Sequence, residues 1–126
     1  MPKDGAAAEG SVSEDCLFCR IVAGTIPADR VHEDDVVIAF RDIAPRAPTH
    51  ILLVPRRHIA SAAELTEADG PMLGRLFAVA ADLAREARIA EVGYRLVSNV
   101  GRWGGQTVDH LHIHLMGGRA FHWPPG

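Results

Sequence analysis

The sequence predicts one α+β domain in which a five-stranded antiparallel sheet packs against one short and one long helix. Two segments, one near the N-terminus and a longer one in the middle of the chain, space their apolar residues as helices do. Five short β-type runs lie between and after these segments. The resulting order, α, β, β, β, α, β, β, favours a meander with both helices on one face of the sheet.

The composition is that of an ordinary globular protein. The chain has 126 residues, of which 48% are hydrophobic and 23% charged, so it can bury a core without disulfides. Its formal net charge of −3 provides no overall positive field for nucleic acid. No apolar run approaches the roughly 20 residues that span a bilayer, and the first residues lack a signal peptide. We therefore expect a cytoplasmic protein without membrane or nucleic-acid partners.

The N-terminal part divides into a tail and a short helix. Residues 1–13 are rich in Gly, Ala, Ser and charge, and we expect a disordered tail that precedes a domain over residues 14–126. Asp15–Ala23 has apolar residues at helical spacing, and Gly24 stands where a C-cap glycine is common. Pro27 prevents this short helix from continuing.

Three β-type runs follow the short helix. Two lie around Val31 and across Val36–Phe40, and the acidic residues Glu33–Asp35 between them predict a hairpin-like turn. Asp42–Pro48 contains two prolines and predicts a loop. The third run, His50–Val54, is almost continuously apolar, so we expect it in the centre of the sheet.

The long helix is predicted over Thr66–Arg88. Thr66 followed three residues later by Asp69 resembles a capping box, and Pro71 falls where the first helical turn tolerates proline. One apolar stripe then marks the face that packs on the core. Its members are Leu73, Leu76, Phe77, Ala80, Leu83, Ala84 and Ala87.

Two further strands are predicted near the C-terminus. They span Tyr94–Asn99 and Thr107–Met116, on either side of a glycine-rich turn at Gly101–Gly105. Two prolines prevent the tail Phe121–Gly126 from continuing as a strand.

The last predicted strand carries three alternating histidines. His110, His112 and His114 would project from one face, because successive side chains of a strand point to opposite faces, and the apolar residues between them would enter the core. A merely solvent-exposed face could use any polar residue, so this pattern favours chemistry. Imidazoles can bind a metal, transfer protons or attack an anionic substrate.

The glycine-rich turn precedes these histidines and is a candidate phosphate-binding loop. Its glycines, Gly105 among them, let backbone N–H groups come close to an anion, and Gln106 and Thr107 add side-chain donors. Asn99 ends the preceding predicted strand and should lie nearby. Taken alone, such a turn is usually structural.

These residues carry a resemblance to a known family. The alternating histidines, followed by Leu115 and Met116, resemble the signature of the histidine triad (HIT) superfamily, and shorter motifs are similar to its Hint branch, the purine nucleoside phosphoramidases. The resemblance extends from Cys16 to Gly126 and implies a HIT-like fold. The shorter motifs are Phe40–Ile43, Ala47–Ile51, Val54–His58, Gly104–Thr107 and His122–Gly126.

The resemblance implies hydrolysis of a phosphoramidate that joins AMP or GMP to an amine. His112 would attack the α-phosphorus, the amine would leave, and water would resolve the nucleotidyl-histidine to the nucleoside monophosphate. His50 and the backbone near His110 are candidates to orient the His112 ring. No cofactor is required for this chemistry. The implied catalytic group is His50, His110, His112 and His114.

The resemblance also implies a nucleotide site. Asp42 would bind the ribose hydroxyls, and Trp123 of a second protomer would shape the leaving-group side. For Asp42 an ordinary loop aspartate, and for the apolar residues simple core packing, are the alternatives. Candidates for an apolar slot around the base are Phe18, Ile21, Phe40 and Ile43. The full expected set is Phe40, Asp42, Ile43, Asn99, Gly105, Gln106, Thr107, His112, His114 and Trp123.

Cys16 and Cys19 form a CxxC pair in the short predicted helix. In a reducing compartment this spacing favours metal ligation or two packed thiols over redox chemistry, because no thioredoxin-type strand precedes it. Some bacterial HIT proteins hold a structural zinc with such a pair and two histidines, which correspond to His58 and His110. The resemblance thus implies a closed Cys₂His₂ zinc site that leaves the other histidines of the row free.

Two other functions stay open. One is hydrolysis of a dinucleoside polyphosphate; His114 argues against the transferase branch of the superfamily, which typically has glutamine there. The other is a non-catalytic nucleotide- or zinc-binding module for protein interaction, which the complete histidine set disfavours.

A homodimer is expected on two grounds. A meander leaves an unpaired sheet edge, which the long helix and the strand Tyr94–Asn99 could cover against a second copy. The resemblance implies dimers in which two five-stranded sheets form one continuous sheet.

Overall fold

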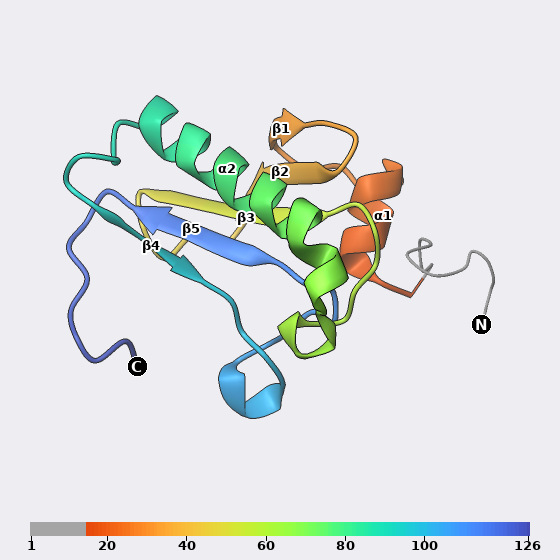
Figure 1. The fold of residues 1–126 in the computed structure, drawn as a ribbon. Helices are drawn as coiled ribbons and strands as arrows, with labels where there is room; N and C mark the ends of the chain where they lie inside the picture. Colours follow the sequence, from red (N-terminus) through yellow and green to blue (C-terminus); the bar gives the residue numbers. More distant parts are fainter. Residues whose placement is uncertain (1–14) are drawn as a thin grey trace.

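The computed structural model describes residues 15–126, so the expected disordered tail lies outside the described residues. These residues form the predicted five-stranded antiparallel sheet with one short and one long helix (Figure 1). The helices are α1 (Leu17–Ala23) and α2 (Gly70–Glu86). The strands are β1 (Arg30–Glu33), β2 (Val37–Arg41), β3 (Thr49–Pro55), β4 (Tyr94–Val97) and β5 (Ile113–Gly117).

The sheet order is β1-β2-β3-β5-β4, with every neighbouring pair antiparallel. β3 lies in the centre, as its apolar composition predicts. The expected simple meander is wrong in one respect, because β5 enters between β3 and β4. β3 and β4 therefore run parallel, and parallel strands need a crossover connection. α2 provides that crossover above the sheet (Figure 1).

The two helices lie on opposite faces of the sheet, which corrects the expectation that both share one face. Consecutive residues of β2 and β3 are apolar, so both faces of these strands must be covered. The cluster on the α2 face contains Val37, Ala39, Ile51, Leu53, Ile113 and Leu115 with Leu76, Val79, Ala80, Leu83 and Ala84. The cluster on the α1 face contains Ile38, Phe40, Leu52 and Val54 with Cys16, Phe18, Cys19 and Ile21.

The predicted capping box before α2 is present. The Thr66 backbone N–H donates to the Asp69 carboxylate at 2.9 Å, but Glu67–Asp69 form a 3₁₀ turn and the α-helix begins only at Gly70. Most of the predicted stripe is buried. Phe77 is 45% exposed instead, because it lies at the margin of the buried face and Val79 takes the core position.

The last strand is shorter than predicted. Residues before Ile113 leave the ladder: the N–H of His110 donates to the carbonyl of Val108, and that of Leu111 donates to the carbonyl of Ile59. His110 therefore lies in a turn ahead of β5. In residues 15–126, no helix is long and apolar enough to cross a membrane.

Candidate active site

The tautomer of His112 is set by the backbone. Its Nδ1–H donates to the carbonyl oxygen of His110 at 2.7 Å, so the neutral ring carries its lone pair on Nε2. The side chain is only 5% exposed. Its ring meets Phe18 edge-on at a centroid distance of 5.0 Å and lies 5.0 Å from the ring of His114. His112 thus presents one unprotonated nitrogen, which is what a nucleophile requires.

His114 has the opposite tautomer because of a two-step hydrogen-bond chain. The backbone N–H of Arg46 donates to Nδ1 of His50 at 3.0 Å, which places the proton of neutral His50 on Nε2. His50 Nε2 lies 2.9 Å from Nδ1 of His114 and donates to it. Neutral His114 therefore carries its proton on Nε2, where it can donate to an anion. Sequence reasoning expected His50 to orient His112, whereas the ring that it contacts is that of His114.

Burial favours the neutral form of the His114 and His50 imidazoles. It lowers the pKa of His114 to about 4, and the neighbouring His112 and His50 act in the same direction. Burial also lowers the pKa of His50; the carboxylate of Asp42, 3.4 Å from His50 Nε2, opposes this effect, and the charge of Arg46 adds to it. The hydrogen-bond roles of His50 and His114 described above therefore hold at neutral pH.

A cavity of about 210 Å³ opens beside these histidines. Ile43 is fully exposed at its mouth, while the carboxylate of Asp42 accepts the N–H of Ala44 at 2.8 Å. Apolar walls beside a carboxylate and two imidazoles suit a nucleoside followed by a phosphate. Ile21, expected in the slot, is buried in the α1-face cluster instead. The expected site residues that line this cavity are Phe18, Phe40, Asp42, Ile43, Thr107, His112 and His114.

The glycine-rich turn is braced by its own side chains. The Gln106 amide donates to the carbonyls of Ala60 at 2.7 Å and Val108 at 3.0 Å, and its oxygen accepts the N–H of Gly101. Both of its N–H donors are therefore engaged, although sequence reasoning assigned them to phosphate. Asn99 likewise donates to the carbonyl of Gly104 at 2.7 Å. These two side chains shape the loop in this structure.

Two other expected contributors lie at the edge of the site. Gly105 has a φ of +85°, a left-handed conformation that favours glycine, and it closes the 3₁₀ turn Arg102–Gly104. Trp123 is 85% exposed, so it does not pack on its own chain. The structure thus leaves Trp123 outside the cavity formed by one copy of the chain.

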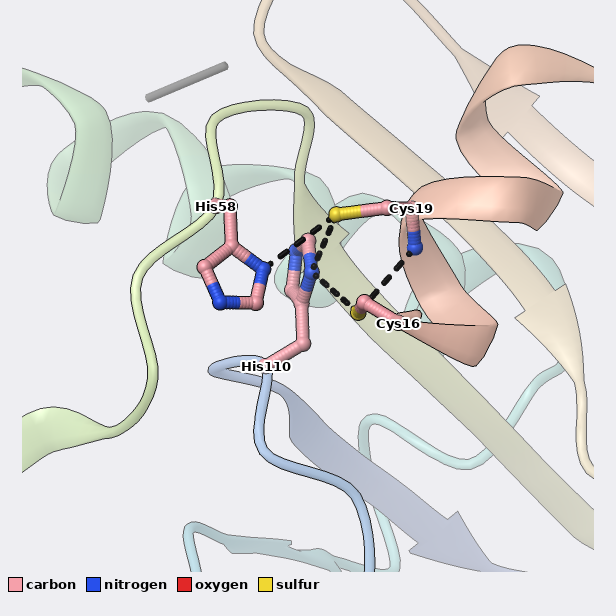
Figure 2. Close-up of side chains that lie close together, drawn as sticks. All are labelled: Cys16, Cys19, His58 and His110. Carbon is pink, nitrogen blue, oxygen red and sulfur yellow. Dashed lines mark hydrogen bonds between the residues drawn. The ribbon is translucent and has the colours of Figure 1, made fainter. Parts of the chain in front are cut away.

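Cys16, Cys19, His58 and His110 form a second cluster (Figure 2). The two cysteines come from the start of α1, His58 from the loop after β3, and His110 from the turn before β5 (Figure 2). The sulfur of Cys16 lies 3.3 Å from Nδ1 of His110, and the sulfur of Cys19 lies 3.2 Å from Nδ1 of His58 and 3.5 Å from Nδ1 of His110. All four ligand atoms lie within 4.8 Å of one another.

These distances suit a tetrahedral metal ion. With Zn–S near 2.3 Å and Zn–N near 2.0 Å, the sulfur–nitrogen edge of a tetrahedron is about 3.5 Å. His110 Nε2–H donates to the carbonyl of Pro55 at 2.8 Å, so its Nδ1 lone pair faces the sulfurs, as a metal ligand must. Burial lowers the pKa of His110 to about 4, which keeps that lone pair free.

His110 joins the two clusters. Its ring belongs to the Cys/His cluster, while its backbone carbonyl accepts a hydrogen bond from Nδ1–H of His112. The row of three histidines expected on one face is therefore divided, because His110 precedes the strand. Its ring turns toward α1, and only His112 and His114 line the cavity.

Sequence reasoning missed three arginines beside the site. Arg46, Arg95 and Arg119 line a second cavity of about 340 Å³, which also contacts His50, Asn99 and His114. They come from the loop before β3, from β4 and from the segment after β5. No local motif unites them, so only the folded chain reveals the group.

Comparisons with known proteins bear on the family and the fold of the chain. The profile of the HIT domain family matches residues 23–121. An uncharacterized HIT-like protein of Synechococcus elongatus is 50% identical over 115 residues, which are 91% of this chain and 100% of that protein. The purine nucleoside phosphoramidase of Escherichia coli is 47% identical over 108 residues, 86% of this chain and 91% of that protein. The crystal structure of a HIT family hydrolase from Legionella pneumophila has a TM-score of 0.87 and 50% identity, covering 88% of this chain and 99% of that one.

Proposed function

The chain belongs to the HIT domain family and is a HIT family hydrolase, and on this premise we propose that it hydrolyses the P–N bond between a purine nucleoside monophosphate and an amine. One observation carries the proposal. The free lone pair on Nε2 of His112 and the Nε2–H of His114 belong to neighbouring rings that line the same cavity. A nucleophile and an anion-binding donor therefore meet where a phosphate would lie.

The first step is attack on the α-phosphorus. The lone pair of His112 Nε2 forms the new P–N bond, and the bond to the amine breaks. The amine leaves with the bonding electrons and takes a proton from water. Neutral His114 does not supply that proton: its Nδ1 already accepts from His50, so loss of its Nε2 proton would leave an imidazolate anion. His114 instead donates its hydrogen bond to a phosphate oxygen throughout the step.

The second step is attack by water on the nucleotidyl-histidine. Water forms the P–O bond, loses a proton to solvent, and His112 leaves as a neutral imidazole with its Nε2 lone pair restored. The carbonyl of His110 holds Nδ1–H of His112 in both steps and stabilises the positive charge of the intermediate. The nucleoside portion would pack against Phe18 and Phe40, and the carboxylate of Asp42 can accept hydrogen bonds from the ribose hydroxyls.

The test compares two substrates at neutral pH. The full-length protein is incubated with AMP linked through nitrogen to a simple alkylamine, and separately with a diadenosine polyphosphate, and AMP release is measured. We expect faster release from the phosphoramidate, and rapid acid-free quenching should trap an AMP adduct on His112, located by peptide mass spectrometry. Faster cleavage of the dinucleotide would favour the alternative hydrolase, and binding without turnover would favour the interaction module.

A structural zinc is part of the proposal. Two thiolates and two imidazole Nδ1 atoms form a donor set that zinc prefers, and their mutual distances fit its radius. Zinc would supply a cross-link between α1 and the turn before β5, while Cys16, Cys19, His58 and His110 hold it. The chemistry at phosphorus needs no step through this site. Elemental analysis of chelator-free protein should give one zinc per chain.

A further inference from the structure

The cavity of about 340 Å³ beside the proposed nucleotide site is strongly cationic. Its lining contains three arginines and no aspartate or glutamate among residues 15–126. Its polar lining consists of His50, Asn99 and His114 together with Arg46, Arg95 and Arg119. We name it the arginine cavity.

The side chains of Arg95 and Arg119 are held in place by contacts other than ion pairs. Arg119 donates from Nε to the carbonyl of Arg46 at 2.9 Å, and Arg95 donates from Nη2 to the carbonyl of His122 at 2.7 Å. Both guanidinium groups lie over the ring of Phe121, at 4.2 Å for Arg119 and 5.0 Å for Arg95. Within residues 15–126 none of the three forms an ion pair. Their positive charge thus remains available to a ligand.

The position of the cavity relates it to the reaction. We call the cavity of about 210 Å³ the nucleotide cavity. Of the two cavities, His112 lines only the nucleotide cavity, whereas His114 lines both. Displacement at phosphorus places the attacking and leaving atoms roughly in line on opposite sides. With the nucleoside against Phe18 and Phe40 and the phosphate between the two histidines, the leaving group points away from His112. The arginine cavity adjoins His114 and is not lined by His112, so it is the cavity available to a group that points away from His112.

We propose that the arginine cavity receives the leaving group, and that the preferred leaving group is an amine that carries a negative charge, such as a carboxylate. This inference rests on the proposed function. Arginine suits the task, because its planar guanidinium can donate two parallel hydrogen bonds to a carboxylate. The same charge disfavours a cationic amine, so the cavity selects by attraction and repulsion together.

The test uses three AMP phosphoramidates with amines of similar length, made from β-alanine, β-alaninamide and propanediamine. Their distal groups are anionic, neutral and cationic at neutral pH. We expect kcat/KM to fall in that order, with about a tenfold advantage of the anionic over the neutral substrate. Raising the salt concentration should reduce this advantage, because ions screen exposed charges.

Arg46 offers the cleanest variant, since its backbone N–H and carbonyl, and not its side chain, make the hydrogen bonds described above. In Arg46→Gln the ratio of kcat/KM for the anionic over the neutral substrate should fall about threefold. Arg46→Lys keeps the charge and should retain most of the ratio. Arg85→Gln is the matched control, because Arg85 lies on α2 and pairs with Asp82. Comparing ratios removes differences in amine reactivity and in overall stability.

The outcomes separate this inference from the proposed function. If none of the phosphoramidates releases AMP, the proposed function fails. If all three are cleaved with equal kcat/KM, or if Arg46→Gln leaves the ratio unchanged, the proposed function stands and the anionic leaving group is refuted. A variant that changes the molecular mass in light scattering but not the ratio would also refute it, because the arginines would then serve assembly.

Discussion

Single hydrogen bonds decide the tautomers of the two histidines that line the nucleotide cavity, His112 and His114. A carbonyl oxygen can only accept, so the contact between His112 Nδ1 and the His110 carbonyl leaves Nε2 unprotonated. A backbone N–H can only donate, so the contact from Arg46 to His50 starts the chain that protonates His114 on Nε2. Two adjacent imidazoles thereby take complementary roles without any difference in residue type.

Replacement of His112 tests the nucleophile. His112→Ala should lower phosphoramidate turnover by at least about a thousandfold, because the unprotonated Nδ1 of His114, the other imidazole that lines this cavity among the described residues, is engaged by His50. The side chain is buried against Phe18, so a loss of about 1–2 kcal/mol in the free energy of unfolding is also expected. Single-turnover kinetics and circular dichroism measure the two effects. Substantial turnover by a folded variant would rule out the covalent mechanism.

His114 should make the stability of the protein depend on pH. Its pKa is about 4 in the folded chain and 6.5 without the fold. Between these values the unfolded chain binds a proton that the folded chain does not, so the contribution of His114 is complete above pH 6.5 and is lost as the pH falls through about 4.

Thermal unfolding of the wild type and of His114→Gln over this pH range provides the measurement. The wild type should lose about 5 °C more between pH 6.5 and 4 than the variant does. The two proteins share the Cys/His cluster, so its own pH dependence cancels in the comparison. Parallel curves would contradict the depressed pKa of His114.

At the scale of elements, the Cys/His cluster joins α1 to the turn before β5. α1 has only seven residues, too few to be stable alone. It begins with Cys16 as N-cap and ends at Gly24, whose φ of +83° is the predicted left-handed C-cap. Its place on the sheet depends on the α1-face cluster and on the contacts of its two cysteines.

Removal of one cysteine tests the proposed zinc. Cys19→Ala should abolish zinc binding, lower the free energy of unfolding by about 3 kcal/mol or more, and speed amide exchange in α1 while leaving α2 protected. A chelator added to the wild type should reproduce these effects. If the cysteines are two packed thiols, the wild type would contain no metal and the chelator would change nothing.

Two glycines give a matched pair of packing predictions. A Cβ at Gly117 in β5 would lie 3.2 Å from Cβ of Ile89, so Gly117→Ala should destabilise by about 1–3 kcal/mol. A Cβ at Gly74 in α2 meets nothing within 4 Å, so Gly74→Ala should stabilise by about 0.5–1 kcal/mol. Denaturant unfolding measures both. Equal effects would show that Ile89 does not pack against Gly117 as described.

At the scale of the whole molecule, β1 and β4 form the two edges of the sheet, and the β4 edge is the candidate dimer surface. β4 pairs only with β5 among the described strands, and Phe77, Val92 and Val100 are exposed apolar residues of α2 and of the segments beside β4. An open edge with apolar neighbours favours pairing with a second copy. We therefore propose that two copies form a homodimer with a continuous sheet, and that they meet at β4 and these exposed apolar residues.

Light scattering at micromolar concentration tests the dimer. Two chains of 13.6 kDa should give about 27 kDa. Trp123→Ala should leave this mass unchanged but alter kcat/KM for substrates with bulky amines, because in the proposed dimer the exposed Trp123 would reach the partner's site. A mass near that of one chain would refute the dimer, and an unchanged substrate profile would refute the role of Trp123.

Much of the molecule follows from local patterns in the sequence. Periodicity predicted five strands and two helices, the capping box at Thr66, the C-cap at Gly24 and the central position of β3. The alternation of His112, Ile113 and His114 also predicted which side chains enter the core. These features depend on residues that are close in sequence, where the geometry of a strand or a helix is the only constraint.

Other features required the tertiary structure, because they depend on contacts between distant segments. Apolar residues on both faces of β2 do not specify which helix covers which face, and only packing placed α1 opposite α2. Beside the turn at His110, the backbone N–H of Leu111 donates to the carbonyl of Ile59, which is far away in the sequence. This contact takes the segment with His110 out of the strand. Arg46, Arg95 and Arg119 meet for the same reason. The sequence by itself predicted the elements and His112 as the proposed nucleophile, whereas the fold decided which groups set the tautomer of His112 and which arginines gather beside the site.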